Sequence, residues 1–143
     1  MADTVTEGRL PAAITNTFRS VGIVVADIDR SIAFYRDVVG MQERRRFDLP
    51  AMHLLEVVMG FGAEGGGAAL VLMHYTDKTD RRYVDIGGKL VIGATDPAAV
   101  VDAARAAGCE IVAEVSEFPG FGLIGFIKDP DGYSVEVLEA TAG

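Results

Sequence analysis

Apolar and polar residues follow two patterns along this chain: short apolar runs typical of strands, and apolar positions repeated at helical spacing. Residues 18–26 form the first run, which is too apolar for one face in water and predicts a strand covered on both faces. Asp27 or Asp29 can cap the helix that follows, and Gly40 ends it. Three further strands are predicted over residues 41–48, 52–60 and 68–75. The first half of the chain is therefore predicted to be a βαβββ unit.

The second half of the chain repeats this order. A separation of 69 positions lays the strand that begins at Ser20 over a strand that begins at Lys89. A separation of 65 positions lays residues 67–73 over residues 132–138. The elements predicted in the second unit are a helix over 97–107 and strands over 111–115, 123–128 and 133–139. An internal repeat of this length predicts a duplicated fold.

These elements predict an α+β fold in a single domain of 143 residues. Module one covers about residues 18–75, a charged linker covers 76–88, and module two covers about 89–139. Residues 1 to about 16 are predicted to form a loose arm or a segment packed on a partner. Because both modules carry strand faces of unequal polarity, we expect their sheets to wrap around a shared cleft.

Composition and charge narrow the possible partners. The net charge of −8 at pH 7 argues against nucleic acid, which is bound by clustered Lys and Arg. No apolar run approaches the ~20 residues of a membrane span. The N-terminus lacks the basic start and apolar segment of a secretory signal, and the single cysteine, Cys109, fits a reducing compartment. We therefore expect a cytoplasmic protein that binds neither nucleic acid nor membrane.

A run of three arginines, Arg44 to Arg46, is a local exception to the acidic composition. Successive side chains of a regular strand point to opposite faces, so Arg45 should point away from its two neighbours. A single basic patch is therefore not expected. The run is instead interpreted as an edge strand that its charges protect from pairing.

Two motifs carry a resemblance to a known family. Ser31-Ile-Ala-Phe-Tyr35 with Gly40-Met41, and Asp129-Pro-Asp-Gly-Tyr-Ser-Val-Glu136, resemble the signatures of the vicinal oxygen chelate superfamily. This superfamily includes glyoxalase I, bleomycin-resistance proteins, extradiol dioxygenases and methylmalonyl-CoA epimerase. The resemblance extends from about Phe18 to Glu139. It implies paired βαβββ modules that form an incomplete barrel around a cleft, a homodimer, and a divalent metal in the enzymatic members.

The resemblance also implies where metal ligands would lie. The family places them on the first and last strands of each module, at the positions of Ser20, Val71, Lys89 and Glu136. Only Glu136 is of a ligand type, whereas a catalytic metal needs about three protein ligands. No metal and no other cofactor are therefore expected. Glyoxalase I also tends to carry an arginine that meets glutathione, and Val24 stands at that position.

The geometry implied by the resemblance aims Lys89 and Glu136 into one apolar cleft. In one interpretation they form a buried ion pair that replaces the metal, with the lysine keeping the glutamate ionised. In the other, Glu136 acts as a general base beside a substrate carbonyl and Lys89 stabilises the oxyanion. Both interpretations remain open on the sequence alone.

The remaining candidate residues concern substrate binding. The cleft face would be shared by Ser20, Gly22, Val71, Met73 and Gly93. The two glycines interrupt apolar strands, which favours the close approach of a ligand, and the methionine supplies an adaptable apolar wall. A hydrophobic small molecule, aromatic or polycyclic, fits such a cleft.

Two further pairs of residues are weaker candidates. His53 and Glu56 differ by three positions, so an unbulged strand aims them to opposite faces, and either is an isolated cleft candidate. Phe118 and Phe121 flank Pro-Gly in a segment that is either a lid over the cleft or a rigid surface turn.

Three functions are compatible with these residues. The leading hypothesis is a metal-independent, dimeric isomerase, epimerase or lyase that performs acid–base chemistry beside the carbonyl of a hydrophobic substrate. The alternative is a non-catalytic protein that sequesters a ligand, as in resistance proteins. A second alternative is a glyoxalase-like metalloenzyme with a ligand set drawn from Glu136, His53 or Glu56. The identity of the substrate, and whether the cleft lies within one chain or across a swapped dimer, are not determined by the sequence.

Overall fold

A computed structural model of the chain describes residues 8–9, 11, 13, 16–63, 67–82 and 87–140. Most of the predicted N-terminal arm, and residues 83–86 of the predicted linker, lie outside the described residues. Module one contains β1 (Ser20–Val24), α1 (Ile28–Ala33), a π-helical turn (Phe34–Val38), β2 (Gln42–Leu49), a 3₁₀ turn (Pro50–Met52), β3 (Leu54–Gly60) and β4 (Ala69–Tyr75). Module two contains β5 (Lys89–Ala94), α2 (Pro97–Ala106), β6 (Ile111–Phe118), β7 (Gly122–Lys128) and β8 (Ser134–Glu139).

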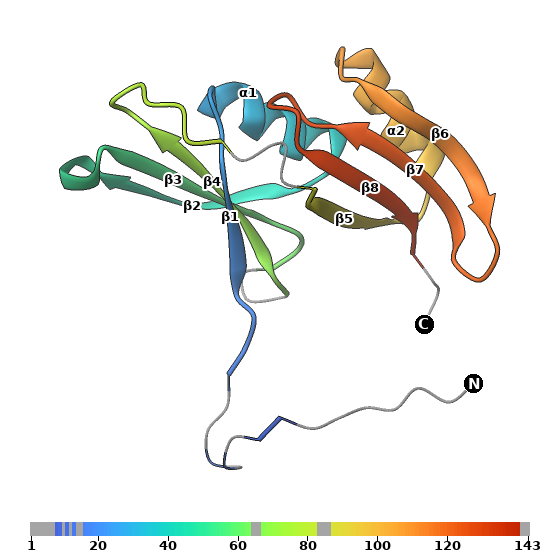
Figure 1. Cartoon of the computed structure of the whole chain (residues 1–143), viewed down its shortest axis with the longest axis horizontal. Helices are drawn as coiled ribbons and strands as arrows, with labels where there is room; N and C mark the ends of the chain where they lie inside the picture. Colours follow the sequence, from blue (N-terminus) through green and yellow to red (C-terminus); the bar gives the residue numbers. More distant parts are fainter. Residues whose placement is uncertain are drawn as a thin grey trace.

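The strands form two sheets of four, ordered β1-β4-β3-β2 and β5-β8-β7-β6 (Figure 1). β1 pairs in parallel with β4, and β5 pairs in parallel with β8. The other neighbouring strands are antiparallel. Neither sheet closes on itself, so the α+β fold of two tandem βαβββ modules is confirmed. No helix in the described part of the chain has the length and apolar character needed to cross a bilayer.

Local sequence signals explain both helices. Asp27 caps α1 by accepting a hydrogen bond from the backbone N–H of Arg30 at 3.0 Å, and Gly40 ends the helical segment with φ of +89°. Asp96 caps α2 in the same way, and Pro97 occupies the first helical position, where its missing N–H costs nothing.

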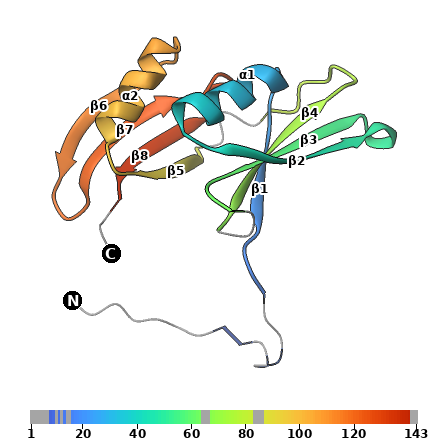
Figure 2. The ribbon, with the colours of Figure 1, turned by 180° about the vertical axis from the view of Figure 1, so that it is seen from behind.

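Both helices lie on the same side of the molecule, and α2 contacts the π-helical turn (Figures 1 and 2). Alternate residues of the inner strands β3, β4 and β8 point toward the helices and are buried, so one apolar core extends through both modules. The core includes Tyr35, Val57, Leu72, Val101, Ala104 and Val137. Among the described elements, no helix lies on the opposite sides of the sheets, and we call these sides the open faces. Ser20, Gly22, Glu56, Val71 and Met73 lie on the open face of module one, and Lys89, Val91, Phe126, Ser134 and Glu136 on that of module two.

The two sequence motifs meet where the modules join. The Tyr35 hydroxyl donates a hydrogen bond to Asp129 Oδ2 at 2.7 Å, and the Ser31 hydroxyl donates to Asp131 Oδ2 at 3.1 Å. The backbone N–H of Ala26 also donates to Asp131 Oδ1, at 2.8 Å. Burial, followed by the charge of Asp129, raises the pKa of Tyr35 well above its ordinary value. The residues that carry the family resemblance therefore form hydrogen bonds between module two and the helical segment of module one, which consists of α1 and the π-helical turn.

Two predicted strand properties are wrong. The first strand is not covered on both faces, since Val21 is 42% exposed and Ser20 and Gly22 are exposed. Its apolar run suits an edge strand whose open face lacks a covering element in the single chain. The third strand begins at Leu54 rather than Met52, because His53 takes a left-handed conformation with φ of 51° after the 3₁₀ turn.

Candidate functional site

The open face of module two holds an ion pair. Lys89 begins β5 and Glu136 lies on the neighbouring strand β8, and Lys89 Nζ stands 2.8 Å from Glu136 Oε1. The lysine side chain is 50% exposed and the glutamate side chain 12% exposed. The ammonium also lies 5.9 Å from the centre of the Phe126 ring. The two residues singled out as a catalytic pair are therefore in contact, with an enclosed carboxylate and an accessible ammonium.

A second amine lies beside this ion pair. Ser134 is the β8 neighbour of both Lys89 and Lys128, so the three residues form a row across the sheet. Lys128 Nζ donates a hydrogen bond to the Ser134 hydroxyl at 2.9 Å. Together with Glu136, the row brings two ammonium groups and one carboxylate to the same open face. Such a face suits a ligand oxygen that carries negative charge.

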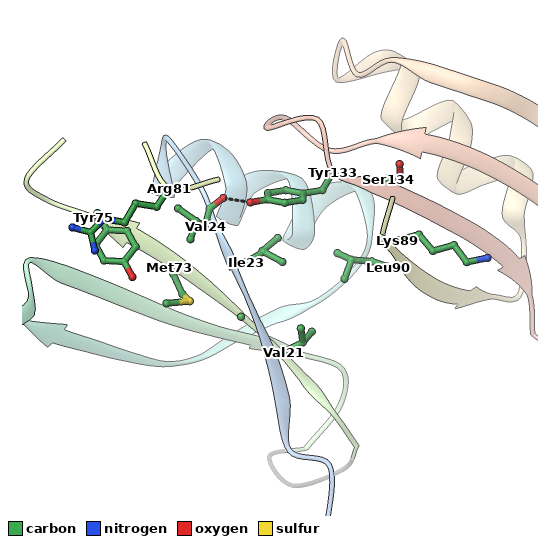
Figure 3. Close-up of a pocket in the computed structure, with 12 residues that line it drawn as sticks. Val21, Ile23, Val24, Met73, Tyr75, Arg81, Lys89, Leu90, Tyr133 and Ser134 are labelled. Carbon is green, nitrogen blue, oxygen red and sulfur yellow. Dashed lines mark hydrogen bonds between the residues drawn. The ribbon is translucent and has the colours of Figure 1, made fainter. Parts of the chain in front are cut away.

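An apolar pocket of about 540 Å³ lies where the two modules meet (Figure 3). Its apolar walls come from β1, β4, β5 and the turn before β8, and include Val21, Ile23, Met73, Leu90 and Tyr133. Arg81 stacks on the ring of Tyr75 at 4.1 Å on the far side of this pocket. Tyr133 donates a hydrogen bond to the Val24 carbonyl at 2.6 Å, which holds its ring in the wall. The walls suit a hydrophobic ligand with an aromatic surface.

The residues predicted to share one cleft do not all line one pocket in the described part of the chain. Gly22, Met73 and part of Lys89 line the apolar pocket, but Glu136 does not. Figure 3 shows the Lys89 side chain extending away from Met73 and Tyr75. Ser20 and Val71 line a different pocket on the open face of module one. The residues predicted to share one cleft are therefore divided between two open faces.

The glycine positions have different surroundings. A Cβ atom at Gly22 would lie 2.7 Å from Met73 Sδ, so the group that approaches this glycine is a side chain of the same sheet. At Gly93 the nearest atom to an added Cβ is the Cβ of Ala140 at 3.9 Å. Close approach therefore explains Gly22 without a ligand, and Gly93 has free space.

The weaker candidates line neither pocket. His53 occupies the turn before β3, whereas Glu56 lies within β3 between Phe47 and Met73. Phe118 and Phe121 flank a tight turn at the tip of the β6–β7 hairpin, closed by a hydrogen bond from Phe121 N–H to Phe118 O at 3.0 Å. The segment is a surface turn whose two rings are exposed, and neither ring lines the apolar pocket.

Sequence reasoning missed Tyr75, Arg81 and Tyr133 as pocket residues. Arg81 falls in the charged linker, and its Nη2 lies 3.3 Å from Asp77 Oδ2. Tyr133 follows Gly132 in the second motif, and that position is the signal that could have identified it. Cys109 is not a reactive candidate, because burial raises the pKa of its thiol.

A family model described as the Glyoxalase/Bleomycin resistance protein/Dioxygenase superfamily matches residues 17–137. The chain belongs to this superfamily. It is 36% identical over 123 residues to a probable lactoylglutathione lyase of Vibrio parahaemolyticus, covering 83% of this chain and 89% of that protein. It is 34% identical over 117 residues to the lactoylglutathione lyase of Haemophilus influenzae, covering 80% and 86%.

Solved structures share the fold of this chain. Glyoxalase I of Leishmania major, described as trypanothione-dependent, superposes with a TM-score of 0.75 at 30% identity and 87% coverage of both chains. TnmS3, an antibiotic-binding protein from Streptomyces, superposes with a TM-score of 0.68 at 18% identity, covering 92% of this chain and all of that one. The second likeness concerns the fold alone.

The residues of this superfamily member do not fit the metal that the resemblance implies. Valine has no donor atom, and the Lys89 ammonium already contacts the carboxylate of Glu136. Across the described residues, His, Cys, Asp and Glu side chains form no group of three that could hold a metal ion. His53 and Glu56 are accordingly not gathered with Glu136 in the single chain.

Proposed function

We propose that this superfamily member performs acid–base chemistry beside the carbonyl of a hydrophobic small molecule, without a metal. The ion pair of Lys89 and Glu136 carries the proposal, because it stands at two positions where the resemblance implies metal ligands. A cation in contact with a carboxylate provides both charges that proton abstraction next to a carbonyl requires.

In the proposed reaction Glu136 removes the proton from the carbon next to the carbonyl. The carbonyl oxygen then gains negative charge as an enolate, which the Lys89 ammonium stabilises. Return of the proton to the same carbon gives an epimer, and its return to a neighbouring atom gives an isomer. Loss of a leaving group from the enolate gives a lyase reaction. The half-exposed ammonium and the enclosed carboxylate support this division of roles.

The proposed active form is a homodimer in which the open face of module one in one copy covers the open face of module two in the other. Two exposed apolar residues, Phe47 and Val91, support this arrangement, since one lies on each open face. Pairing would also unite the positions of Ser20 and Val71 with those of Lys89 and Glu136. Sedimentation velocity tests the dimer, and Val91→Glu should shift it toward monomer. A cytoplasmic location, proposed from the single cysteine, is compatible with this assembly.

The experiment measures turnover of lactoylglutathione, the compound in the relatives' names, and of a panel of hydrophobic ketones. Lys89→Met and Glu136→Gln should each lower kcat/KM by ~10²–10⁴-fold, which is the usual contribution of a positioned acid–base group. Lys128→Met, a matched change on the same face, should have a much smaller effect. A chelator should leave turnover unchanged. Full activity of both variants at the ion pair, or restoration of chelated protein by a divalent metal, contradicts the proposal.

A second candidate function is sequestration of a hydrophobic ligand. It is favoured by the apolar pocket, whose described walls contain no carboxylate and do not include Glu136. A ligand that binds tightly, yields no product and binds equally well to Glu136→Gln would decide for sequestration. Met73→Ala should weaken that binding, because Met73 forms part of the pocket wall.

A further inference from the structure

Two neighbouring rows of side chains cross the open face of module two. The strand register gives the members of each row, which are Lys128, Ser134 and Lys89 in the first and Phe126, Glu136 and Val91 in the second. Ser134 and Glu136 are two positions apart on β8, so the rows lie ~7 Å apart. The proposed reaction uses Lys89 and Glu136 and leaves Lys128 without a role.

Lys128 carries a charge that its hydrogen-bond partner does not neutralise. Its Nζ donates to the Ser134 hydroxyl at 2.9 Å, whereas Lys89 Nζ contacts a carboxylate at 2.8 Å. In the part of the chain that the structure describes, Lys128 forms no ion pair with an acidic side chain. The chain has a net charge of −8, so a cation that is paired only with a hydroxyl is an exception on this protein. Such a cation is available to an anionic group of a ligand.

The second row places apolar side chains on both sides of Glu136. Val91 is 49% exposed, and the centre of the Phe126 ring lies 5.9 Å from Lys89 Nζ. These two side chains offer apolar surface next to the carboxylate that removes the proton in the proposed reaction. A ligand that lies along β8 therefore meets a free positive charge at the first row. At the second row it meets the ion pair and an apolar surface.

We propose that the substrate is an aromatic oxo acid. Its carboxylate binds Lys128 and Ser134, its ketone oxygen accepts a hydrogen bond from Lys89, and its aromatic body lies against Phe126. A spacing of ~7 Å between the rows suits an acid whose carboxylate is two carbon atoms away from the ketone carbon. Lys128 is then a specificity-determining residue, and Ser134 is a positioning residue that holds its ammonium. This inference names the substrate class of the proposed reaction, and it rests on that proposal for the position of the ketone.

Binding of 4-oxo-4-phenylbutanoate to the full chain, measured by isothermal titration calorimetry, tests the carboxylate contact without any turnover. The reference compound is 4-oxo-4-phenylbutanamide, which keeps the ring and the ketone but has no charge. The acid should bind roughly tenfold more tightly than the amide, which is the usual contribution of a hydrogen bond to a charged group. The preference should decrease as salt is raised, because the contact is ionic.

Variants locate the carboxylate. Lys128→Gln should reduce the preference for acid over amide to less than about twofold. Arg105→Gln is the matched control, because it removes the same charge from the helix side, where Arg105 pairs with Glu114, and it should keep the preference. Ser134→Ala should weaken the preference, and Ser134→Thr should restore it, since threonine keeps the hydroxyl that holds Lys128.

Proton exchange separates this inference from the proposed function. Glu136 takes a proton from the carbon next to the ketone, exchanges it with deuterated water and returns a deuteron, and proton NMR follows the loss of signal at that carbon. Lys128→Gln should raise KM for the acid about tenfold with little change in kcat, whereas Glu136→Gln should lower kcat. Exchange that is absent from the wild type while the acid is still preferred contradicts the acid–base proposal alone.

Three results overturn the assignment of Lys128. One is equal affinity of the wild type for acid and amide. Another is a preference that survives Lys128→Gln, because the carboxylate then binds elsewhere. The third is a loss of preference in Arg105→Gln as large as in Lys128→Gln, because only the overall charge of the chain then matters. Exchange of acid and amide with the same KM would leave the acid–base proposal standing without this substrate class.

Discussion

The open faces of the two modules carry different chemistry on the same framework. In module two the amines of Lys89 and Lys128 have hydrogen-bonded partners in Glu136 and Ser134. In module one the positions equivalent to the ion pair are Ser20 and Val71, and the positive charge lies instead on the arginines at the edge of the sheet. A duplicated fold therefore fixes where strands lie without fixing where charge lies. The open face of module two, with its ion pair, suits proton transfer. The open face of module one, with its arginines, suits holding an anion.

The covered faces differ much less. Both are apolar, and both pack against a helix that begins with an aspartate cap. The contrast indicates that packing constrains the covered faces of both modules, whereas the open faces are free to carry different ligand chemistry. The following changes test how far the two modules can be treated separately.

The largest effect on stability is expected where the modules join. Asp131 is fully enclosed and accepts hydrogen bonds from Ala26 N–H and the Ser31 hydroxyl, and it lies within 3.5 Å of Arg30. Asp131→Ala leaves these donors unpaired and should lower the free energy of unfolding by ~3 kcal/mol. Urea unfolding measures the change. The control is Asp37→Ala, which removes an exposed ion pair with Arg36 and should have no measurable effect. A loss in Asp131→Ala no larger than in the control would mean that the junction does not hold the modules together.

The order of elements was predictable because its signals are local. Asp27, Asp96 and Gly40 cap or end helices through contacts within a few residues, and the tandem arrangement follows from the repeat. The contact between Lys89 and Glu136 was also predictable, because the family resemblance places them on the first and last strands of module two, and these strands pair.

The site was less predictable, because bulges and tertiary packing decide it. Alternation assigns Arg44 and Arg45 to opposite faces, and only the register shift after Glu43 places both in one pocket. The exposure of Val21 depends on which sheet faces are covered, and a single strand pattern does not encode this. Arg81 reaches the apolar pocket by stacking on Tyr75 from a charged linker that has no periodicity.

The ion pair of module two is the next test. Lys89→Met leaves the enclosed carboxylate of Glu136 without its partner and should destabilise the protein by ~1–2 kcal/mol, less than for a fully buried pair because the ammonium is half exposed. The double variant Lys89→Met/Glu136→Gln should recover part of this loss. Urea unfolding of both single variants and the double variant gives the coupling energy. Strictly additive losses would mean that the two groups do not interact.

The pH dependence of stability tests the buried carboxyl of Asp129, which lies where the modules join. Burial raises the pKa of Asp129 above its ordinary value of 3.8, so the folded protein holds this proton more tightly than the unfolded chain. The contribution of Asp129 to stability is therefore fully present below pH 3.8 and is lost as pH rises through the raised folded pKa. The free energy of unfolding of wild type minus that of Asp129→Asn should thus decrease with rising pH in this window. Chemical unfolding at closely spaced pH values measures it, and a difference that increases with pH contradicts the sign.

The smallest effects are expected at the two open-face glycines. Gly93 has room for a Cβ atom, so Gly93→Ala should stabilise the protein by ~0.5 kcal/mol through the lower entropy of the unfolded chain. Gly22→Ala lowers the entropy of the unfolded chain in the same way, but its new Cβ atom would lie 2.7 Å from Met73 Sδ, which would have to move. The substitution should therefore be neutral or destabilising. Thermal and urea unfolding of the two variants compare them directly. In a protein that already carries Met73→Ala the clash is absent. Adding Gly22→Ala to that protein should therefore change the free energy of unfolding as Gly93→Ala changes that of the wild type. If Gly22→Ala is unfavourable even without the Met73 side chain, the backbone of β1 and not the thioether requires glycine.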